Sequence, residues 1–106
     1  MNITINKNGD ELYAAIFGQM NAQTSPMIEV QLVSTLDGAK AVTLDLAELE
    51  YISSAGLRVL LTVMQYMDEH NSKLTVKNVR PEIMSILELT GFSANLNIHR
   101  HGHKTA

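Results

Sequence analysis

The alternation of hydrophobic and polar residues predicts several short strands. Ile3 and Ile5 alternate with polar neighbours. An apolar run at 12–17 follows the turn signal Asn8-Gly9-Asp10. The chain is therefore expected to begin with a β-hairpin. Residues 42–46 alternate in the same way, as in a strand with one buried face. Strands are expected at 3–5, 12–17, 42–46, 74–76 and 95–98.

Apolar residues that recur with a helical period predict three helices. The helices are expected over about 25–37, 56–70 and 81–91. The first is expected to have Ser25 as its N-cap and Pro26 at its first helical position. The second carries two apolar rows, so it is either deeply buried or in contact with a partner protein.

Strands that alternate with helices predict a sheet covered by helices. The expected fold class is a single α/β domain, a mixed sheet of about four to five strands in the order β-β-α-β-α-β-α-β. The 106 residues are enough for one core. The domain is expected to span residues 1–98, and the polar stretch 99–106 is expected to be a disordered tail.

Composition narrows the possible functions. The net charge is −3 and no basic stripe is present, which argues against a nucleic acid partner. There is no cysteine, and neither a signal peptide nor an apolar run of membrane-spanning length, so we expect a cytoplasmic domain that does not insert into membranes. His99, His101 and His103 alternate and could bind a transition metal weakly, but a floppy tail is the simpler interpretation. No metal site and no cofactor are predicted.

The stretch YISSAGL, residues 51–57, stands between a predicted strand and the second helix. In one interpretation a serine caps the helix, which stabilises it by about 1 kcal/mol. One serine would be enough for that, and Ala55-Gly56 leaves the helix start open to close approach. In the other interpretation a serine is modified, because a phosphate would meet free N–H groups and the positive end of the helix dipole. The residues alone leave both interpretations open.

A serine hydrolase is not supported by the same residues. The elbow motif G-x-S-x-G is absent because Ile52, not glycine, lies two residues before Ser54. The candidate base within the ordered part, His70, is expected at the far end of the following helix, roughly 20 Å away. We therefore expect no catalysis by this chain.

At the run LDLAELEYISSAGLRVLL the sequence resembles the STAS domain family, in particular bacterial anti-sigma factor antagonists. The turn GQMNAQTSP (18–26) and the ending ILELTGF (86–92) are similar to two further segments of that family. The resemblance covers about 3–98 of the chain.

The resemblance implies a regulator that acts by partner switching. In that family the unphosphorylated antagonist binds an anti-sigma factor or related serine kinase of the histidine-kinase-like ATPase type. The kinase phosphorylates the serine two residues before a Gly-Leu pair, the complex separates, and a serine phosphatase restores it. Carried over to this chain, the phosphorylation site is Ser54. The implied partner-binding residues are Asn21, Ser53, Ser54, Ala55, Gly56, Leu57 and Arg58.

Two positions depart from the family pattern. Ser53 and Asn21 each stand where well-known members have aspartate, so the unmodified site is less acidic here. Arg58 could partly offset an added phosphate, although a solvated helix residue is the simpler interpretation. Asp45 either orients the loop that carries Ser54 or points out of the sheet and caps a nearby N–H. An alternative function is an accessory STAS subunit of a membrane lipid-transport ATPase, without a phosphorylation switch.

Overall fold

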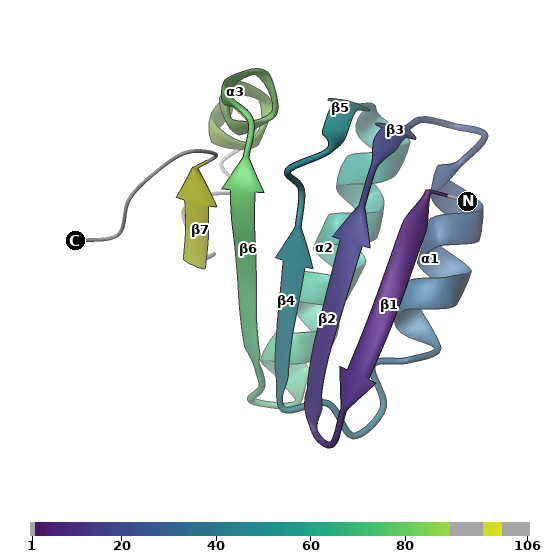
Figure 1. The fold of residues 1–106 in the computed structure, drawn as a ribbon, viewed down its shortest axis with the longest axis vertical. Helices are drawn as coiled ribbons and strands as arrows, with labels where there is room; N and C mark the ends of the chain where they lie inside the picture. Colours follow the sequence, from purple (N-terminus) through teal and green to yellow (C-terminus); the bar gives the residue numbers. More distant parts are fainter. Residues whose placement is uncertain (1, 90–96, 101–106) are drawn as a thin grey trace.

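The computed structural model describes residues 2–89 and 97–100, and its elements follow the expected α/β order (Figure 1). In chain order they are β1 (Ile3–Asn8), β2 (Glu11–Ile16), β3 (Gly18–Met20), α1 (Ser25–Val33), β4 (Ala41–Asp45), β5 (Leu49–Ile52), α2 (Ser54–Glu69), β6 (Lys73–Val79), α3 (Pro81–Leu89) and β7 (Asn97–Arg100). The main sheet has the strand order β1-β2-β4-β6-β7. β1 and β2 are antiparallel and the other pairs are parallel, so the predicted mixed sheet is confirmed.

The core lies between this sheet and the helices α1 and α2, which cover one of its faces (Figure 1). The register places Ala14, Leu44 and Val76 side by side on β2, β4 and β6, and all three are buried. Val59 and Val63 of α2 belong to the same buried cluster. Burial of each large apolar side chain contributes roughly 1.5–3 kcal/mol, so these contacts hold α2 against the sheet.

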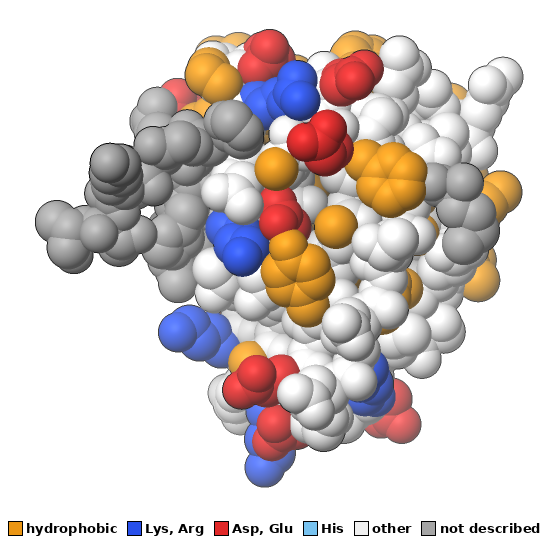
Figure 2. Space-filling view, in the orientation of Figure 1, with side chains coloured by type: hydrophobic (Ala, Val, Ile, Leu, Met, Phe, Trp, Pro, Cys, Tyr) orange, Lys and Arg blue, Asp and Glu red, His pale blue; other side chains and the backbone are white. Residues whose placement is uncertain are grey.

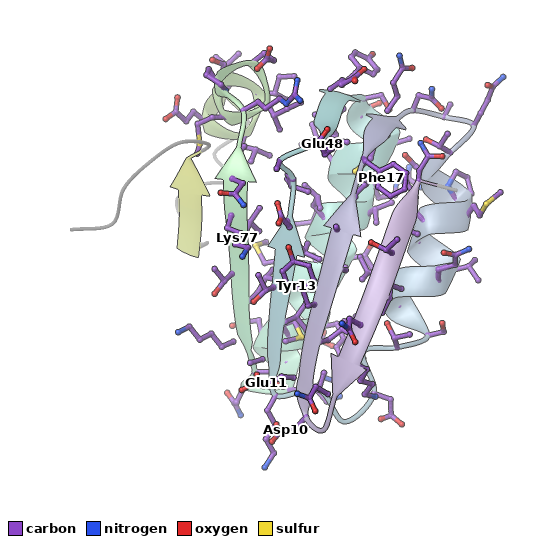
Figure 3. The ribbon with its side chains drawn as sticks, viewed as in Figure 1. Asp10, Glu11, Tyr13, Phe17, Glu48 and Lys77 are labelled. Carbon is purple, nitrogen blue, oxygen red and sulfur yellow. The ribbon has the colours of Figure 1, made fainter. Side chains whose placement is uncertain are left out.

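The opposite face of the sheet carries mainly polar side chains (Figure 2). Tyr13 and Lys77 project from it, and the lysine Nζ lies 5.1 Å from the centre of the tyrosine ring (Figure 3). The alternation within the strands that predicted one buried face therefore places polar residues on the other.

A second sheet of two short strands was missing from the sequence prediction. β3 and β5 pair in parallel next to the ends of β2 and β4. Gly18 adopts φ +79° and its N–H donates to the Glu48 carbonyl at 2.9 Å, which brings the two segments together. Strands of three and four residues have no room for an alternating pattern, so periodicity could not reveal them.

Several element boundaries differ from the expectation. The prediction that Ser25 is the N-cap of the first helix was wrong, because Thr24 holds that position and Ser25 is the first helical residue. The helix ends at Val33, and α2 begins at Ser54, two residues before the expected Gly56. β7 ends at Arg100, two residues later than expected, and residues 95 and 96 of the expected strand lie outside the described residues. The expected end of the third helix at Gly91 and the histidines 101 and 103 lie outside the described residues.

No helix in the described part of the chain combines the length and the apolar character needed to cross a membrane.

Candidate functional site

Ser54 is the first residue of α2, and its side chain is exposed. Its Oγ makes no hydrogen bond to any residue that the structure describes. Its hydroxyl is therefore accessible to another molecule, at a helix start where N–H groups lack intrahelical partners.

Ser53 occupies the N-cap position of α2 but does not cap it with its side chain. Its carbonyl accepts the first helical bond, from the Leu57 N–H at 2.9 Å. Its Oγ is buried and has no partner among the described residues. A serine therefore does occupy the N-cap position, as the cap interpretation expected, but its side chain makes no hydrogen bond to the helix start.

The start of α2 is fixed closely against the small sheet. The Ser53 N–H donates to the Met20 carbonyl at 2.8 Å. A Cβ on Gly56 would lie 2.7 Å from Ile52 Cγ1 and 2.7 Å from Met20 Cβ. Gly56 is buried, so its small size serves packing within the domain and it offers no side chain to a partner.

Asn21, in the loop before α1, has a structural part in the site. Its Oδ1 accepts hydrogen bonds from the N–H groups of Gln23 and Thr24, at 2.9 and 3.0 Å. Its own N–H donates to Thr24 Oγ1 at 3.0 Å. The loop requires an acceptor oxygen at position 21, and asparagine supplies it without the charge of an aspartate.

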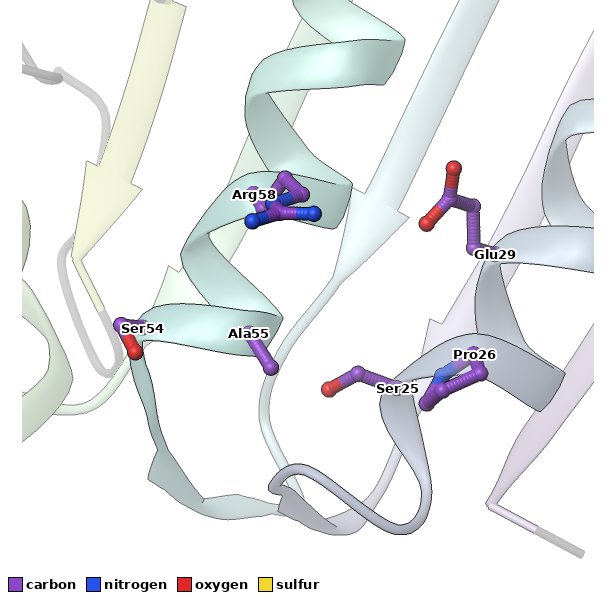
Figure 4. Close-up of a pocket in the computed structure, with 6 residues that line it drawn as sticks. All are labelled: Ser25, Pro26, Glu29, Ser54, Ala55 and Arg58. Carbon is purple, nitrogen blue, oxygen red and sulfur yellow. The ribbon is translucent and has the colours of Figure 1, made fainter.

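A groove of about 300 Å³ lies between the starts of α1 and α2 (Figure 4). Ser54, Ala55 and Arg58 line it from α2. Its other wall consists of Ser25, Pro26 and Glu29 from α1, which sequence reasoning did not include in the site. The helix-start signal Ser25-Pro26 and the family-like turn at 18–26 marked that segment, but nothing in the sequence indicated that it faces Ser54.

Leu57 is partly buried against the core, whereas Arg58 is exposed. Leu61, one turn further along α2, is 39% exposed. Ser54, Arg58 and Leu61 have the spacing that places residues on one helical face. The apolar row of α2 that contains Leu57 and Leu61 is therefore divided between the core and the surface beside Ser54.

His70, the candidate base whose side chain the structure describes, does not reach Ser54. His70 lies at the C-terminal end of α2, and the 16-residue helix places it roughly 24 Å from Ser54. Its ring Nδ1 is 2.8 Å from the Tyr66 carbonyl oxygen. Within the described residues, no three histidine or acidic side chains lie close enough to hold a metal ion.

Asp45 lies outside the groove and ties three elements together. Its carboxylate accepts hydrogen bonds from Tyr13 Oη, from the Ala47 N–H at 3.0 Å and from Asn78 Nδ2 at 3.1 Å. Burial alone would raise the pKa of Asp45, but these hydrogen bonds and nearby Lys77 bring it below its ordinary value. The hydrogen bond to Asp45, together with burial and the carboxylate charge, raises the pKa of Tyr13 to about 12. The interpretation of Asp45 as a residue that caps a nearby N–H is confirmed.

Comparisons with known proteins agree with this architecture. A model of the STAS domain matches residues 2–104. A Bordetella bronchiseptica protein named as an anti-sigma factor antagonist, BtrV, is 34% identical over 93 residues, which is 87% of this chain and 80% of the relative.

Two solved structures share the fold. An anti-sigma factor antagonist from Mycobacterium paratuberculosis superposes with a TM-score of 0.80 at 20% identity, covering 92% of this chain and 85% of the other. The phosphorylated form of SpoIIAA from Bacillus superposes with a TM-score of 0.73 at 11% identity, covering 91% and 89%. The chain therefore belongs to the STAS domain family and, within it, to the anti-sigma factor antagonists.

Proposed function

We propose that this chain is the antagonist of a partner switch in which Ser54 carries the signal. Unphosphorylated, it binds an anti-sigma factor that is also a serine kinase of the histidine-kinase-like ATPase type. The kinase transfers the terminal phosphoryl group of ATP to Ser54 Oγ, with release of ADP and a proton, and the complex separates. A serine phosphatase removes the phosphate and restores binding. Anti-sigma factor antagonists are regulators without enzymatic activity, and this role would be carried out in the cytoplasm.

The observation that carries the proposal is the accessible Ser54 hydroxyl at the first residue of α2. A kinase could reach it without unfolding the helix, because no hydrogen bond to a described residue has to be broken. Relatives support the same reading: BtrV is named as an anti-sigma factor antagonist, and SpoIIAA has been solved in a phosphorylated form.

The surface around Ser54 explains why phosphorylation would end the complex. Leu61 and the half-buried Leu57 give the unmodified face apolar area that a partner can cover. A phosphate adds a charge of about −1.5 to −2 at pH 7. Burying that charge against a partner without a matching cation costs several kcal/mol, which is enough to separate a complex.

Affinity capture from native lysate with three baits tests the proposal. The baits are the unmodified chain, Ser54→Asp and Ser34→Asp, and bound proteins are identified by mass spectrometry. Ser34 follows α1 at the end remote from Ser54 and is exposed, so Ser34→Asp controls for added charge, although it also removes the hydrogen bond from Ser34 Oγ to the Gln31 carbonyl. We expect a histidine-kinase-like ATPase on the unmodified and Ser34→Asp baits and its loss from Ser54→Asp. Equal recovery of transporter subunits by all three baits would instead favour an accessory subunit of a lipid-transport ATPase.

A further inference from the structure

Ser25 has a hydroxyl group that the fold itself leaves without a partner. The residue is only 1% exposed, and its Oγ makes no hydrogen bond to any described residue. Buried hydroxyls nearly always have a partner, so such a group suggests a ligand that completes the site. Ser25 lines the groove, and Figure 4 shows its oxygen directed from α1 toward Ala55 at the start of α2.

Hydrogen-bond donors predominate among the polar groups of the groove and of the helix start beside it. The first N–H groups of α2, at Ser54, Ala55 and Gly56, precede the first helical hydrogen bond, which Leu57 makes to Ser53. Arg58 lines the groove and contributes a guanidinium group. The starts of two helices of 9 and 16 residues meet here, so both helix dipoles direct their positive ends toward the groove.

We propose that the groove between α1 and α2 binds a phosphate monoester. The Ser25 hydroxyl, the Arg58 guanidinium and the free N–H groups at the start of α2 act as donors to its oxygens. Glu29 is the acidic residue on the wall, and its charge opposes the ligand. The groove thus combines donors of three kinds with one carboxylate that limits affinity.

Two sources can supply this chemistry. The first is the phosphate on Ser54 itself, which lines the same groove and would be held within the chain. The second is a phosphate on a separate molecule. Only the first source rests on the proposed function, so the two are tested separately.

Titration of the unmodified, ¹⁵N-labelled chain with inorganic phosphate tests the site itself. We expect saturable NMR shifts of the Ser54, Ala55 and Gly56 amides. Ser25→Ala and Arg58→Gln should each weaken binding about tenfold. Glu29→Gln should strengthen it about two- to threefold, because a repulsive charge is removed. Lys73→Gln, which removes an exposed cation at the start of β6, is the control and should change nothing.

Ser25→Ala also shows whether weaker phosphate binding comes from loss of the hydroxyl or from unfolding of the domain. Removing a buried hydroxyl without a partner leaves the core satisfied, so this variant should unfold at the same temperature or higher. Weak phosphate binding in a fully folded variant would then assign the effect to Oγ. Shifts that do not saturate, or equal weakening by Lys73→Gln and Arg58→Gln, would overturn the proposal.

A chain with phosphoserine at position 54 identifies the source. If its phosphate occupies the groove, ³¹P NMR should show its second ionisation at lower pH than in a free phosphopeptide, and Ser25→Ala should reverse this. Inorganic phosphate should then no longer bind. A phosphoserine that titrates as in the free peptide while inorganic phosphate still binds would assign the groove to an external phosphate. Failure of the proposed switch would leave the phosphate titration of the unmodified chain unaffected, so the two proposals can fail separately.

Discussion

The Ser53 N–H and the Met20 carbonyl oxygen form a 2.8 Å hydrogen bond that joins the two loops of the site. β3 leads from Met20 into the Asn21 loop, and β5 leads through Ser53 into α2. Since these two strands also pair with each other, the wall from α1 and the wall from α2 are held in one rigid frame. The geometry around Ser54 therefore depends on contacts beneath it.

Gly56→Ala should damage this frame. The added methyl group would meet Ile52 Cγ1 and Met20 Cβ at 2.7 Å, and relief of that overlap requires α2 to move away from the small sheet. We expect a loss of about 1–3 kcal/mol in the free energy of unfolding, reduced by up to about 1 kcal/mol because alanine favours the helix. Chemical denaturation measures this. Ala55→Gly, which makes the opposite replacement at the neighbouring position, is the control. A Gly56→Ala variant more stable than the unmodified chain would contradict the packing argument.

Ser53→Ala should not destabilise the chain, although Ser53 is the N-cap of its longest helix. A serine that caps through its side chain would lose about 1 kcal/mol on this change. Here the Oγ is buried without a partner, so its removal should leave the free energy of unfolding unchanged or raise it by up to about 1 kcal/mol.

Thr24→Ala provides the contrast. The Thr24 Oγ1 donates to the Gln19 carbonyl at 2.7 Å and accepts from the Asn21 N–H at 3.0 Å. Its loss should lower the free energy of unfolding by about 1–2 kcal/mol. Equal effects of the two substitutions in denaturant titrations would show that Ser53 makes a cap bond in solution.

Ser54→Asp should raise the stability of the fold and at the same time weaken binding of the partner. A carboxylate at the first residue of α2 interacts favourably with the helix dipole, so the free energy of unfolding should rise by about 0.3–1 kcal/mol. Affinity for the proposed partner kinase should fall about tenfold or more, because the same charge would be buried on binding. Ser54→Ala should retain binding. If Ser54→Asp bound as tightly as Ser54→Ala in calorimetry, a charge at this position would not control the complex.

Leu61→Glu tests the apolar area beside Ser54. Leu61 is 39% exposed and lies on the same helical face as Arg58, so its replacement should weaken partner binding about tenfold or more. The domain should stay folded, because the Leu61 side chain is only partly buried in the unmodified chain. Leu89→Glu is the control, since Leu89 is 87% exposed at the end of α3. A loss of affinity in both variants alike would place the interface elsewhere.

The Tyr13–Asp45 pair predicts a defined pH dependence of stability. The pKa of Asp45 is lowered, so its contribution is present above its ordinary value of 3.8 and is lost as the pH falls through the lower folded value. The pKa of Tyr13 is raised from 10.0 to about 12, so its contribution is complete below pH 10.0 and is lost as the pH rises to about 12.

Tyr13→Phe should therefore be less stable than the unmodified chain by about 1 kcal/mol near neutral pH. That difference should narrow below pH 3.8 and again between pH 10.0 and about 12. Thermal unfolding followed across this range measures it. Tyr51→Phe is the control, because it removes the hydroxyl of an exposed tyrosine that makes no side-chain hydrogen bond to a described residue.

The sequence was sufficient to predict the elements with a clear period, and it singled out the residues that line one wall of the groove. Alternation predicted β1, β4 and β6, an apolar run predicted β2, and helical spacing predicted α1, α2 and α3. The SSAGL motif brought attention to Ser54 and Arg58, which the fold does place together. Ser25 and Glu29 could not be found in this way, because their distance from Ser54 along the chain is closed only by the packing of α1 beside α2. The sequence also could not show that the Ser53 side chain makes no cap hydrogen bond, because that depends on the local geometry and not on the residue type.

The direction of the parallel strands has a practical consequence. β2, β4 and β6 all end at the edge that carries the groove, so the turns before them lie at the opposite edge (Figure 1). At two of these turns, Gly9 and Gly38 have no atom within 4 Å of where a side chain would begin. A reporter domain inserted there would leave the groove and the surface beside Ser54 uncovered. The chain could therefore be built into a biosensor that reports binding of its partner in living cells.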